Sequence, residues 1–209
     1  MRIGTNPTCL IYLKLPRELK PEKKTKETEG TKDGQKIALL SGKGGCGKTT
    51  IGLYIASMLA CYNLKVLLID CDLNTNGATF YCRQNTAGLG APCSFRSLIL
   101  RQDLSTTEKI HIGERIDLIP SNTGMENAGN TAYTFRKNDT AQFETKLNQL
   151  EPEKYDAIIF DCPAGYSDIF RLILPQSDTL LYVLEPDAAN REAYQNLIQK
   201  TGGLRIAGY

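Results

Sequence analysis

The fold of this chain is decided by residues 37–50, which read IALLSGKGGCGKTT. The first four residues are apolar, which is typical of a short buried strand. Residues 42–49 then match the pattern G-x-x-x-x-G-K-[ST], and a helix is predicted over residues 49–62. In this order, a strand, a glycine-rich loop and a helix form a cradle whose backbone N–H groups and helix N-terminus attract phosphate. The stretch therefore predicts a nucleotide-binding α/β domain.

Each part of the loop has an expected task. Lys48 is expected to reach the β- and γ-phosphates, and the Thr49 hydroxyl to bind Mg²⁺. Thr50 is placed for a further phosphate contact. The strand–loop–helix context disfavours the alternative, a glycine-rich turn without a ligand. The predicted nucleotide-binding residues are Gly42, Lys43, Gly44, Gly45, Cys46, Gly47, Lys48, Thr49 and Thr50.

Further along the chain, apolar runs alternate with helical patterns. Because the runs are apolar throughout, they predict parallel strands that are buried on both faces. We expect a three-layer α/β fold of the P-loop type, with a mainly parallel twisted sheet flanked by helices. The expected strands are 37–40, 65–70, 116–120, 157–161, 178–184 and a short one at 204–207, and the expected helices are 49–62, 141–150 and 189–200.

Acidic residues follow two of the expected strands. Asp70 and Asp72 come at the end of one, and Asp161 ends another. Ligands of open α/β sheets bind at the carboxyl ends of the strands, so these carboxylates should face the phosphate loop. There they can hold the Mg²⁺ shell or orient a water molecule for attack on the γ-phosphate. Asp70 and Asp161, with Thr49, are the candidate metal ligands; a turn or helix-capping role is the alternative for Asp72 and Asp161.

Three segments together resemble one protein family. Residues 41–50 are similar to the deviant Walker A motif of the ParA/MinD superfamily of P-loop ATPases, which has a second lysine ahead of the usual one. Residues 70–74 resemble its D-x-D segment, and residues 160–165 resemble its Walker B block. The resemblance covers about residues 37–200.

This resemblance implies a mechanism. In the family the upstream lysine, Lys43 here, crosses a dimer interface to the phosphates of the partner subunit, so that two ATP molecules lie between two subunits. The second acid of D-x-D, Asp72 here, is required for hydrolysis, and Asp161 would act on Mg²⁺ through water. The implied catalytic residues are Lys43, Lys48 and Asp72, and the implied cofactors are ATP or ADP and Mg²⁺.

The implied activity is slow ATP hydrolysis by an ATP-dependent homodimer that partitions DNA or positions a cellular structure. A regulatory protein that stimulates hydrolysis is an expected partner, and DNA or a membrane surface is a possible target. Two other classes stay open. One is a nucleotide-gated scaffold with negligible turnover, and the other is a metabolic or assembly ATPase on the same fold, because fold alone does not fix function.

Composition and charge set limits on the partners. The chain has 209 residues, with 25 Lys and Arg against 23 Asp and Glu, a net charge of +2. This near balance excludes nucleic-acid binding through bulk charge alone and leaves only a local patch. No apolar run reaches the ~20 residues of a membrane helix, and no signal-peptide pattern is present, so a cytoplasmic location is expected. His111 is the single histidine, so a Ser-His-Asp apparatus is disfavoured.

Residues 1–36 differ from the rest of the chain. Charged residues, Pro and Gly dominate residues 16–36, which is typical of a linker, and residues 9–15 can form one strand. We expect a strand-like stub and charged linker over residues 1–36. We expect the P-loop ATPase domain over residues 37–209, and we expect it to be shorter at its C-terminus than in the family.

The seven cysteines are scattered, without a C-x-x-C pair. Reduced thiols are therefore expected, in place of a disulfide framework or a zinc site. Cys46, Cys71 and Cys162 fall in or beside the predicted site, where redox control is an alternative to simple packing.

Overall fold

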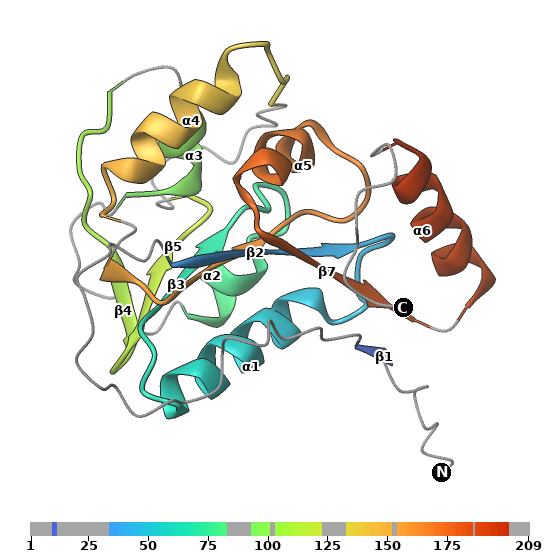
Figure 1. Cartoon of the computed structure of the whole chain (residues 1–209), viewed down its shortest axis with the longest axis horizontal. Helices are drawn as coiled ribbons and strands as arrows, with labels where there is room; N and C mark the ends of the chain where they lie inside the picture. Colours follow the sequence, from blue (N-terminus) through green and yellow to red (C-terminus); the bar gives the residue numbers. More distant parts are fainter. Residues whose placement is uncertain are drawn as a thin grey trace, which may run out of the picture.

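The computed structural model describes residues 10–11, 34–82, 93–100, 103–122, 133–151, 154–185 and 187–200. Its strands are β1 (Leu10–Ile11), β2 (Gln35–Ser41), β3 (Val66–Asp70), β4 (Ile110–Gly113), β5 (Ile116–Ile119), β6 (Ala157–Asp161) and β7 (Thr179–Leu184). They form one sheet in the order β1-β7-β2-β6-β3-β5-β4 (Figure 1). The five inner strands run parallel, and the edge strands β1 and β4 are antiparallel to their neighbours.

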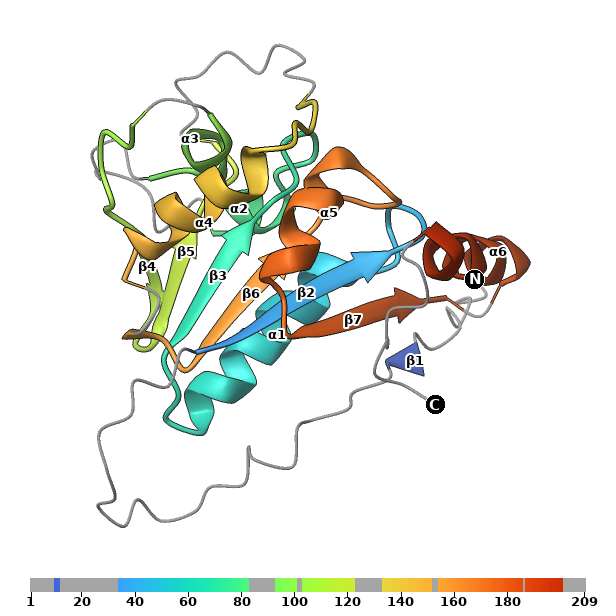
Figure 2. The same cartoon turned by 45° about the horizontal axis from the view of Figure 1, so that its top comes forward.

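Helices cover both faces of this sheet. They are α1 (Lys48–Cys61), α2 (Gly77–Tyr81), α3 (Phe95–Ile99), α4 (Asp139–Asn148), α5 (Asp168–Ile173) and α6 (Ala188–Lys200), with a 3-10 turn, η3 (Leu174–Gln176), after α5. α1 and α2 lie on one face, and α3, α4 and α5 lie on the other (Figure 2). The predicted three-layer α/β fold with a mainly parallel sheet is confirmed.

Alternate residues of each inner strand enter two separate cores. In β2, Ile37 and Leu39 pack with α1, whereas Ala38 and Leu40 belong to the cluster formed with α4 and α5. Every residue of β3 and of β6 is buried. Burial on both faces explains why these strands are apolar throughout and do not alternate with polar residues.

The longer elements agree with the sequence-based expectation. The predicted strands 37–40, 65–70, 116–120, 157–161 and 178–184 correspond to β2, β3, β5, β6 and β7, and the predicted helices 49–62, 141–150 and 189–200 correspond to α1, α4 and α6.

The sequence pattern does not predict β4, α2, α3 or α5. These elements have four to six residues each, too few to display a period. The predicted strand at 204–207 lies outside the described residues. Of the predicted stub and linker, the structure describes only Leu10–Ile11, which pairs with β7, and the residues from 34 onward.

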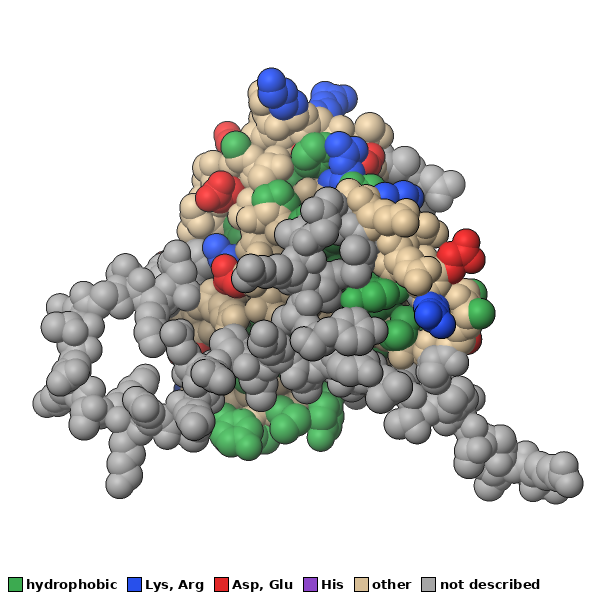
Figure 3. Space-filling view, turned by 45° about the vertical axis from the view of Figure 1, so that its right-hand side comes forward, with side chains coloured by type: hydrophobic (Ala, Val, Ile, Leu, Met, Phe, Trp, Pro, Cys, Tyr) green, Lys and Arg blue, Asp and Glu red, His purple; other side chains and the backbone are tan. Residues whose placement is uncertain are grey.

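Exposed apolar side chains gather on the outer side of α1 and α2. Tyr54, Met58 and Tyr62 follow one another at four-residue spacing along and just after α1, and Phe80 and Tyr81 lie on α2. Figure 3 shows hydrophobic side chains at the lower edge of the molecule, the side on which α1 lies in Figure 1. Among the helices of the described ranges, none combines the length and the hydropathy of a membrane span.

Candidate nucleotide-binding site

The phosphate loop lies between the end of β2 and the start of α1. Gly45 and Gly47 have φ angles of +84° and +85°, the left-handed region that side-chain-bearing residues rarely adopt. A Cβ at either position would meet no atom within 4 Å, so the backbone conformation requires glycine, and the available space does not. The glycines of the motif therefore set the turn that leads into the N-terminus of α1.

Two donors hold the carbonyl of Lys43 inside this turn. Ser41 Oγ donates to it over 3.1 Å, and Cys46 Sγ donates to it over 3.4 Å. The backbone N–H of Gly165 donates to the carbonyl of Ser41 over 2.8 Å. The predicted Walker A and Walker B segments are therefore in direct contact, although they are far apart in the sequence.

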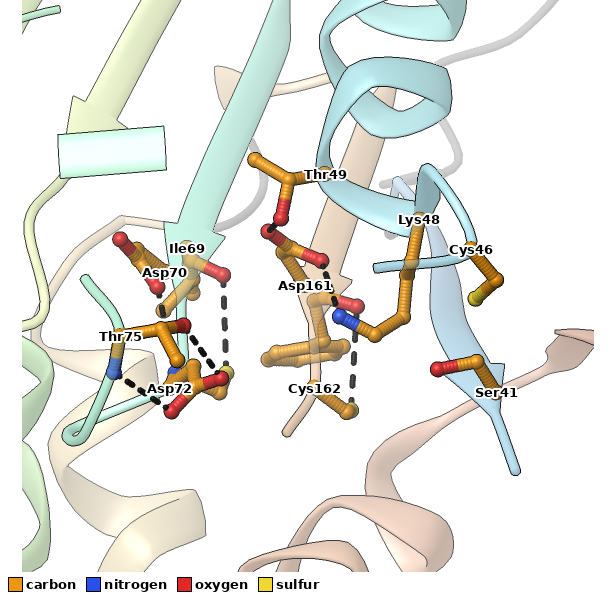
Figure 4. Close-up of polar contacts among 12 residues, drawn as sticks. Ser41, Cys46, Lys48, Thr49, Ile69, Asp70, Asp72, Thr75, Asp161 and Cys162 are labelled. Carbon is orange, nitrogen blue, oxygen red and sulfur yellow. Dashed lines mark hydrogen bonds and ion pairs between the residues drawn. The ribbon is translucent and has the colours of Figure 1, made fainter. Parts of the chain in front are cut away.

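Asp161, at the end of β6, joins the two key side chains of α1 (Figure 4). Lys48 Nζ lies 3.2 Å from Asp161 Oδ1, and Thr49 Oγ1 donates to Asp161 Oδ2 over 2.6 Å. Only 9% of the Lys48 side chain and 1% of the Asp161 side chain are exposed. Burial lowers the pKa of Lys48, but the charge and hydrogen bond of Asp161 oppose it, and the net pKa is raised. The lysine is therefore held as a cation beside a buried carboxylate.

Thr49 and Asp161 form an oxygen donor set that suits Mg²⁺. This ion prefers carboxylate, hydroxyl and water oxygens and usually keeps several waters. In the described part of the chain, no three His, Cys, Asp or Glu residues cluster in a way that could hold a metal. The hydroxyl of Thr49 and the carboxylate of Asp161 fit a Mg²⁺ ion, since this ion usually has few protein ligands and keeps several waters.

Asp70 is placed differently from the sequence-based expectation. It is in register with Asp161 on the neighbouring strand, but its carboxylate is engaged elsewhere. Oδ1 accepts from the backbone N–H of Asp72 over 3.1 Å, and Oδ2 accepts from the backbone N–H and hydroxyl of Thr79 over 2.8 and 2.7 Å. Burial raises the pKa of Asp70 to about 6, although the bonds from Thr79 oppose the rise. Asp70 is thus held by α2 and by its own loop, whereas Asp161 contacts Lys48 and Thr49, so the proposal below places Mg²⁺ on Thr49 and Asp161.

Asp72 lies in the loop after β3, at the same edge of the sheet as Lys48 and Asp161 (Figure 4). Its Oδ1 accepts from the backbone N–H groups of Asn74 and Thr75 over 3.0 and 3.1 Å, and its Oδ2 accepts from Thr75 Oγ1 over 2.7 Å. This is the turn arrangement that the sequence left as the alternative. The Asp72 charge also contributes to the raised pKa of Lys48, so the two groups lie within electrostatic reach.

Lys43 extends from the phosphate loop toward the connection between β7 and α6. Its Nζ lies 2.6 Å from Asp187 Oδ2 and 3.5 Å from Glu185 Oε2. The hydrogen bond to Asp187 is the main cause of its raised pKa. Lys43 is thus bound to carboxylates of its own chain. Thr50, the last residue of the predicted set, is exposed in the first turn of α1.

The cysteines near the site are buried packing residues. The six that the structure describes form no disulfide. Cys71 and Cys162 directly follow Asp70 and Asp161, and both are fully buried. Burial and the neighbouring Cys162 raise the pKa of Cys71 well above its ordinary value. A protonated, buried thiol reacts slowly with oxidants, so the geometry does not favour redox control.

Sequence reasoning missed two sets of supporting side chains. Thr79 contacts both Asp70 and Ser121, and no sequence motif includes Thr79. Glu185 and Asp187 hold Lys43; residues 184–187 resemble a strand end of the family, but the sequence does not indicate their contact with Lys43.

Comparison with known proteins places the chain in a family. A family model described as an AAA domain matches residues 34–205. The septum site-determining protein MinD of Synechocystis is 28% identical over 75% of this chain and 56% of its own length. The sporulation initiation inhibitor protein Soj of Bacillus subtilis is 28% identical over 79% of this chain and 64% of its own length. The chain belongs to the ParA/MinD superfamily of P-loop ATPases.

Solved structures agree with this ParA/MinD assignment. A putative plasmid partition protein of Borrelia burgdorferi bound to AMPPNP has a TM-score of 0.67 and 25% identity, covering 82% of this chain and 72% of that chain. The MinC:MinD cell division complex of Aquifex aeolicus shares the fold, with a TM-score of 0.62 and 20% identity. The match covers 83% of this chain and 66% of the chain in that structure. The match covers only part of these relatives. It spans 56% of MinD, 64% of Soj and 54% of an uncharacterized ATP-binding protein of Methanocaldococcus jannaschii.

Proposed function

We propose that this chain binds MgATP, forms an ATP-dependent homodimer and hydrolyses ATP slowly in the cytoplasm. The observation that carries the proposal is the buried Asp161 carboxylate, which contacts both Lys48 and Thr49. A lysine, a hydroxyl and a carboxylate gathered at a glycine-rich helix N-terminus match the chemistry that phosphoryl transfer requires. Residues 37–209 carry this activity in the proposal.

In the proposed cycle, backbone N–H groups of residues 42–50 and Lys48 hold the phosphates. Thr49 directly, and Asp161 through water, would hold Mg²⁺, which would supply positive charge to neutralise the phosphate oxygens. Asp72 orients the attacking water, and Lys43 reaches the phosphates of the partner subunit. Lys43 is bound to Asp187 in the resting chain, so in the proposal it exchanges this partner for the phosphates of the second subunit when the dimer forms.

The proposed output is the partitioning of DNA or the positioning of a cellular structure. The names of the relatives, MinD and Soj, support this reading. A regulatory protein that speeds hydrolysis, and DNA or a membrane surface as the target, complete the proposal. One observation favours the scaffold alternative with negligible turnover: three hydrogen bonds within its own loop occupy the Asp72 carboxylate.

Phosphate release and light scattering test the proposal together. The full chain should be monomeric with ADP and dimeric with a non-hydrolysable ATP analogue. Lys48→Ala should lose nucleotide binding, Lys43→Ala should bind nucleotide as a monomer, and Asp72→Ala should dimerise without releasing phosphate. Lys137→Ala, an exposed lysine ahead of α4, is the control and should match the original chain. A monomer in both nucleotide states contradicts the proposed dimer, and a dimer that releases no phosphate supports the scaffold.

A further inference from the structure

Hydrogen bonds hold both ends of the loop that carries Asp72, residues 72–76. At its start, the backbone N–H of Asp72 donates to Asp70 Oδ1 over 3.1 Å. At its end, Asn76 Oδ1 accepts from Ser121 Oγ over 2.6 Å and from Asn122 Nδ2 over 3.1 Å. Asn76 has a φ of 51°, a left-handed conformation that asparagine tolerates better than most residues. The loop is therefore held between the end of β3 and the segment after β5.

Thr79 connects these two anchors. Its hydroxyl donates to Asp70 Oδ2 over 2.7 Å and accepts from the backbone N–H of Ser121 over 2.9 Å. Asp70 and Ser121 are both 0% exposed, so solvent does not compete for these bonds. Buried polar bonds of this kind are costly to break, because the freed groups find no water. A single hydroxyl thus connects the first turn of α2 to the end of β3 and to the segment after β5.

The same helix also lies against the proposed magnesium site. A Cβ at Gly77, the first residue of α2, would be 3.0 Å from Thr49 Oγ1. The Asp72 loop leads directly into α2, because Asn76 directly precedes it. A movement of α2 would therefore change the position of Asp72 relative to Thr49.

We infer that Thr79 is a positioning residue: through Asp70 and Ser121 it fixes the loop on which Asp72 orients the attacking water. This inference rests on the proposed function of Asp72. A shift of about 1 Å in a group that orients a nucleophile can lower a rate by up to about a hundredfold. The Thr79 hydroxyl bonds to Asp70 and Ser121, which lie outside the phosphate loop, so we expect its loss to change kcat more than nucleotide affinity.

Thr79→Val and Thr79→Ser separate this role from simple packing. Valine keeps the shape and the backbone N–H bond to Asp70 but removes the hydroxyl, whereas serine keeps the hydroxyl. Thr145→Val is the matched control, because it removes the Thr145 hydroxyl bond to the Ala141 carbonyl on α4. We expect Thr79→Val to lower kcat about tenfold with KM for MgATP within about twofold. Thr79→Ser and Thr145→Val should keep kcat.

Amide hydrogen exchange gives a readout that needs no nucleotide. In the free chain, Thr79→Val should speed exchange at residues 72–76, and Thr79→Ser and Thr145→Val should not. Asn76→Gly keeps the left-handed turn but removes the side-chain oxygen that accepts from Ser121 and Asn122. It should lower kcat and speed exchange as Thr79→Val does, while the bonds of buried Asp70 remain. The Asn76→Gly variant therefore still tests the inference if Thr79→Val fails to fold.

The outcomes separate the inference from the proposed function. If Asp72→Ala abolishes hydrolysis while Thr79→Val and Asn76→Gly leave kcat and exchange unchanged, the positioning role is overturned and the function of Asp72 stands. If Asp72→Ala leaves hydrolysis unchanged, the proposed function of Asp72 fails, and the positioning role fails with it. A rise in KM with constant kcat for Thr79→Val also overturns the inference.

Discussion

Lys43 Nζ lies 2.6 Å from Asp187 Oδ2, so the lysine proposed to cross the dimer interface is bound within its own subunit. Asp187 directly precedes α6, and Glu185 lies at the end of β7 on the same connection. Both partners are partly exposed, which makes the ion pair weak and exchangeable. The geometry suits a lysine that changes partners when a second subunit and its nucleotide arrive.

Removing the acceptor should therefore favour the dimer. We expect Asp187→Asn to lower the concentration of a non-hydrolysable ATP analogue needed for half-maximal dimerisation by about two- to fivefold, the range of a weak exposed pair. Light scattering across an analogue titration measures the midpoint. Asp178→Asn, at another partly exposed carboxylate just before β7, is the charge control. An equal or higher midpoint for Asp187→Asn means that the pair does not compete with the dimer.

The phosphate loop should tolerate alanine at Gly44 but not at Gly47. Gly47→Ala forces a Cβ onto a φ of +85°, which should cost about 1–2 kcal/mol of stability and weaken nucleotide binding. Gly44→Ala is the matched control, because its Cβ would meet no atom within 4 Å and its φ lies outside the left-handed region. Urea unfolding and titration with a fluorescent ADP analogue report the two effects. Equal losses for both variants would show that the loop lacks this turn.

Asp161→Asn should leave Lys48 as a buried cation without its counter-charge. Breaking a buried pair from one side usually lowers the free energy of unfolding by about 3 kcal/mol or more, because the remaining charge stays desolvated. The double variant Lys48→Met/Asp161→Asn should recover part of that loss in urea unfolding without nucleotide. No recovery in the double variant would mean that Asp161 stabilises the fold through Thr49 and not through Lys48.

Asp70 should make stability depend on pH. The pKa of its carboxyl is about 6 in the folded chain, above its ordinary value of 3.8, because burial and the facing Asp161 disfavour the charge. Below pH 4 both states are protonated, and between pH 4 and 6 only the folded state keeps the proton. The stabilisation from this proton is therefore lost as the pH rises, by about 3 kcal/mol in total.

Urea unfolding of the original chain and of Asp70→Asn at pH 4 and pH 7.5, with EDTA present, tests this dependence. The stability difference between the two proteins should shift by about 2 kcal/mol in favour of Asp70→Asn between pH 4 and pH 7.5, because at pH 4 about half of the unfolded state has already lost the proton. The other carboxyls titrate in both proteins and cancel in the difference. A difference that does not change with pH would mean that Asp70 titrates normally.

Local patterns predict the inner sheet and the phosphate loop well. β3 and β6 are buried on both faces, so each is an unbroken apolar run that ends in an acid, and the motif at residues 42–49 needs only sequence neighbours. β4 escapes prediction because Ile110 is buried and His111 is exposed on a strand of only four residues. An alternation of buried and exposed residues over so few positions cannot be distinguished from a loop in the sequence.

Contacts between distant residues are not visible in local patterns. The sequence predicts Asp70 as a metal ligand because it ends a strand. Its bonds to Thr79 form only because α2 packs against the end of that strand, which spacing does not indicate. The same holds for Lys43 and Asp187, which are 144 positions apart in the chain. Spacing can place a carboxylate at the right edge of a sheet, but it cannot tell which donor satisfies that carboxylate.

The strand order has a consequence for how this protein is made. β2, which leads into the phosphate loop, pairs only with β6 and β7, and β3 pairs with β6 and β5. During synthesis, β2 and the glycine-rich loop therefore emerge from the ribosome before β6. In the described residues β6 is the first strand along the chain that pairs with β2. Sheets closed by such distant pairings form slowly and leave apolar strands unpaired in the meantime. The phosphate loop thus becomes able to hold a nucleotide only after β6 and β7, which are translated much later than β2, have joined the sheet beside it.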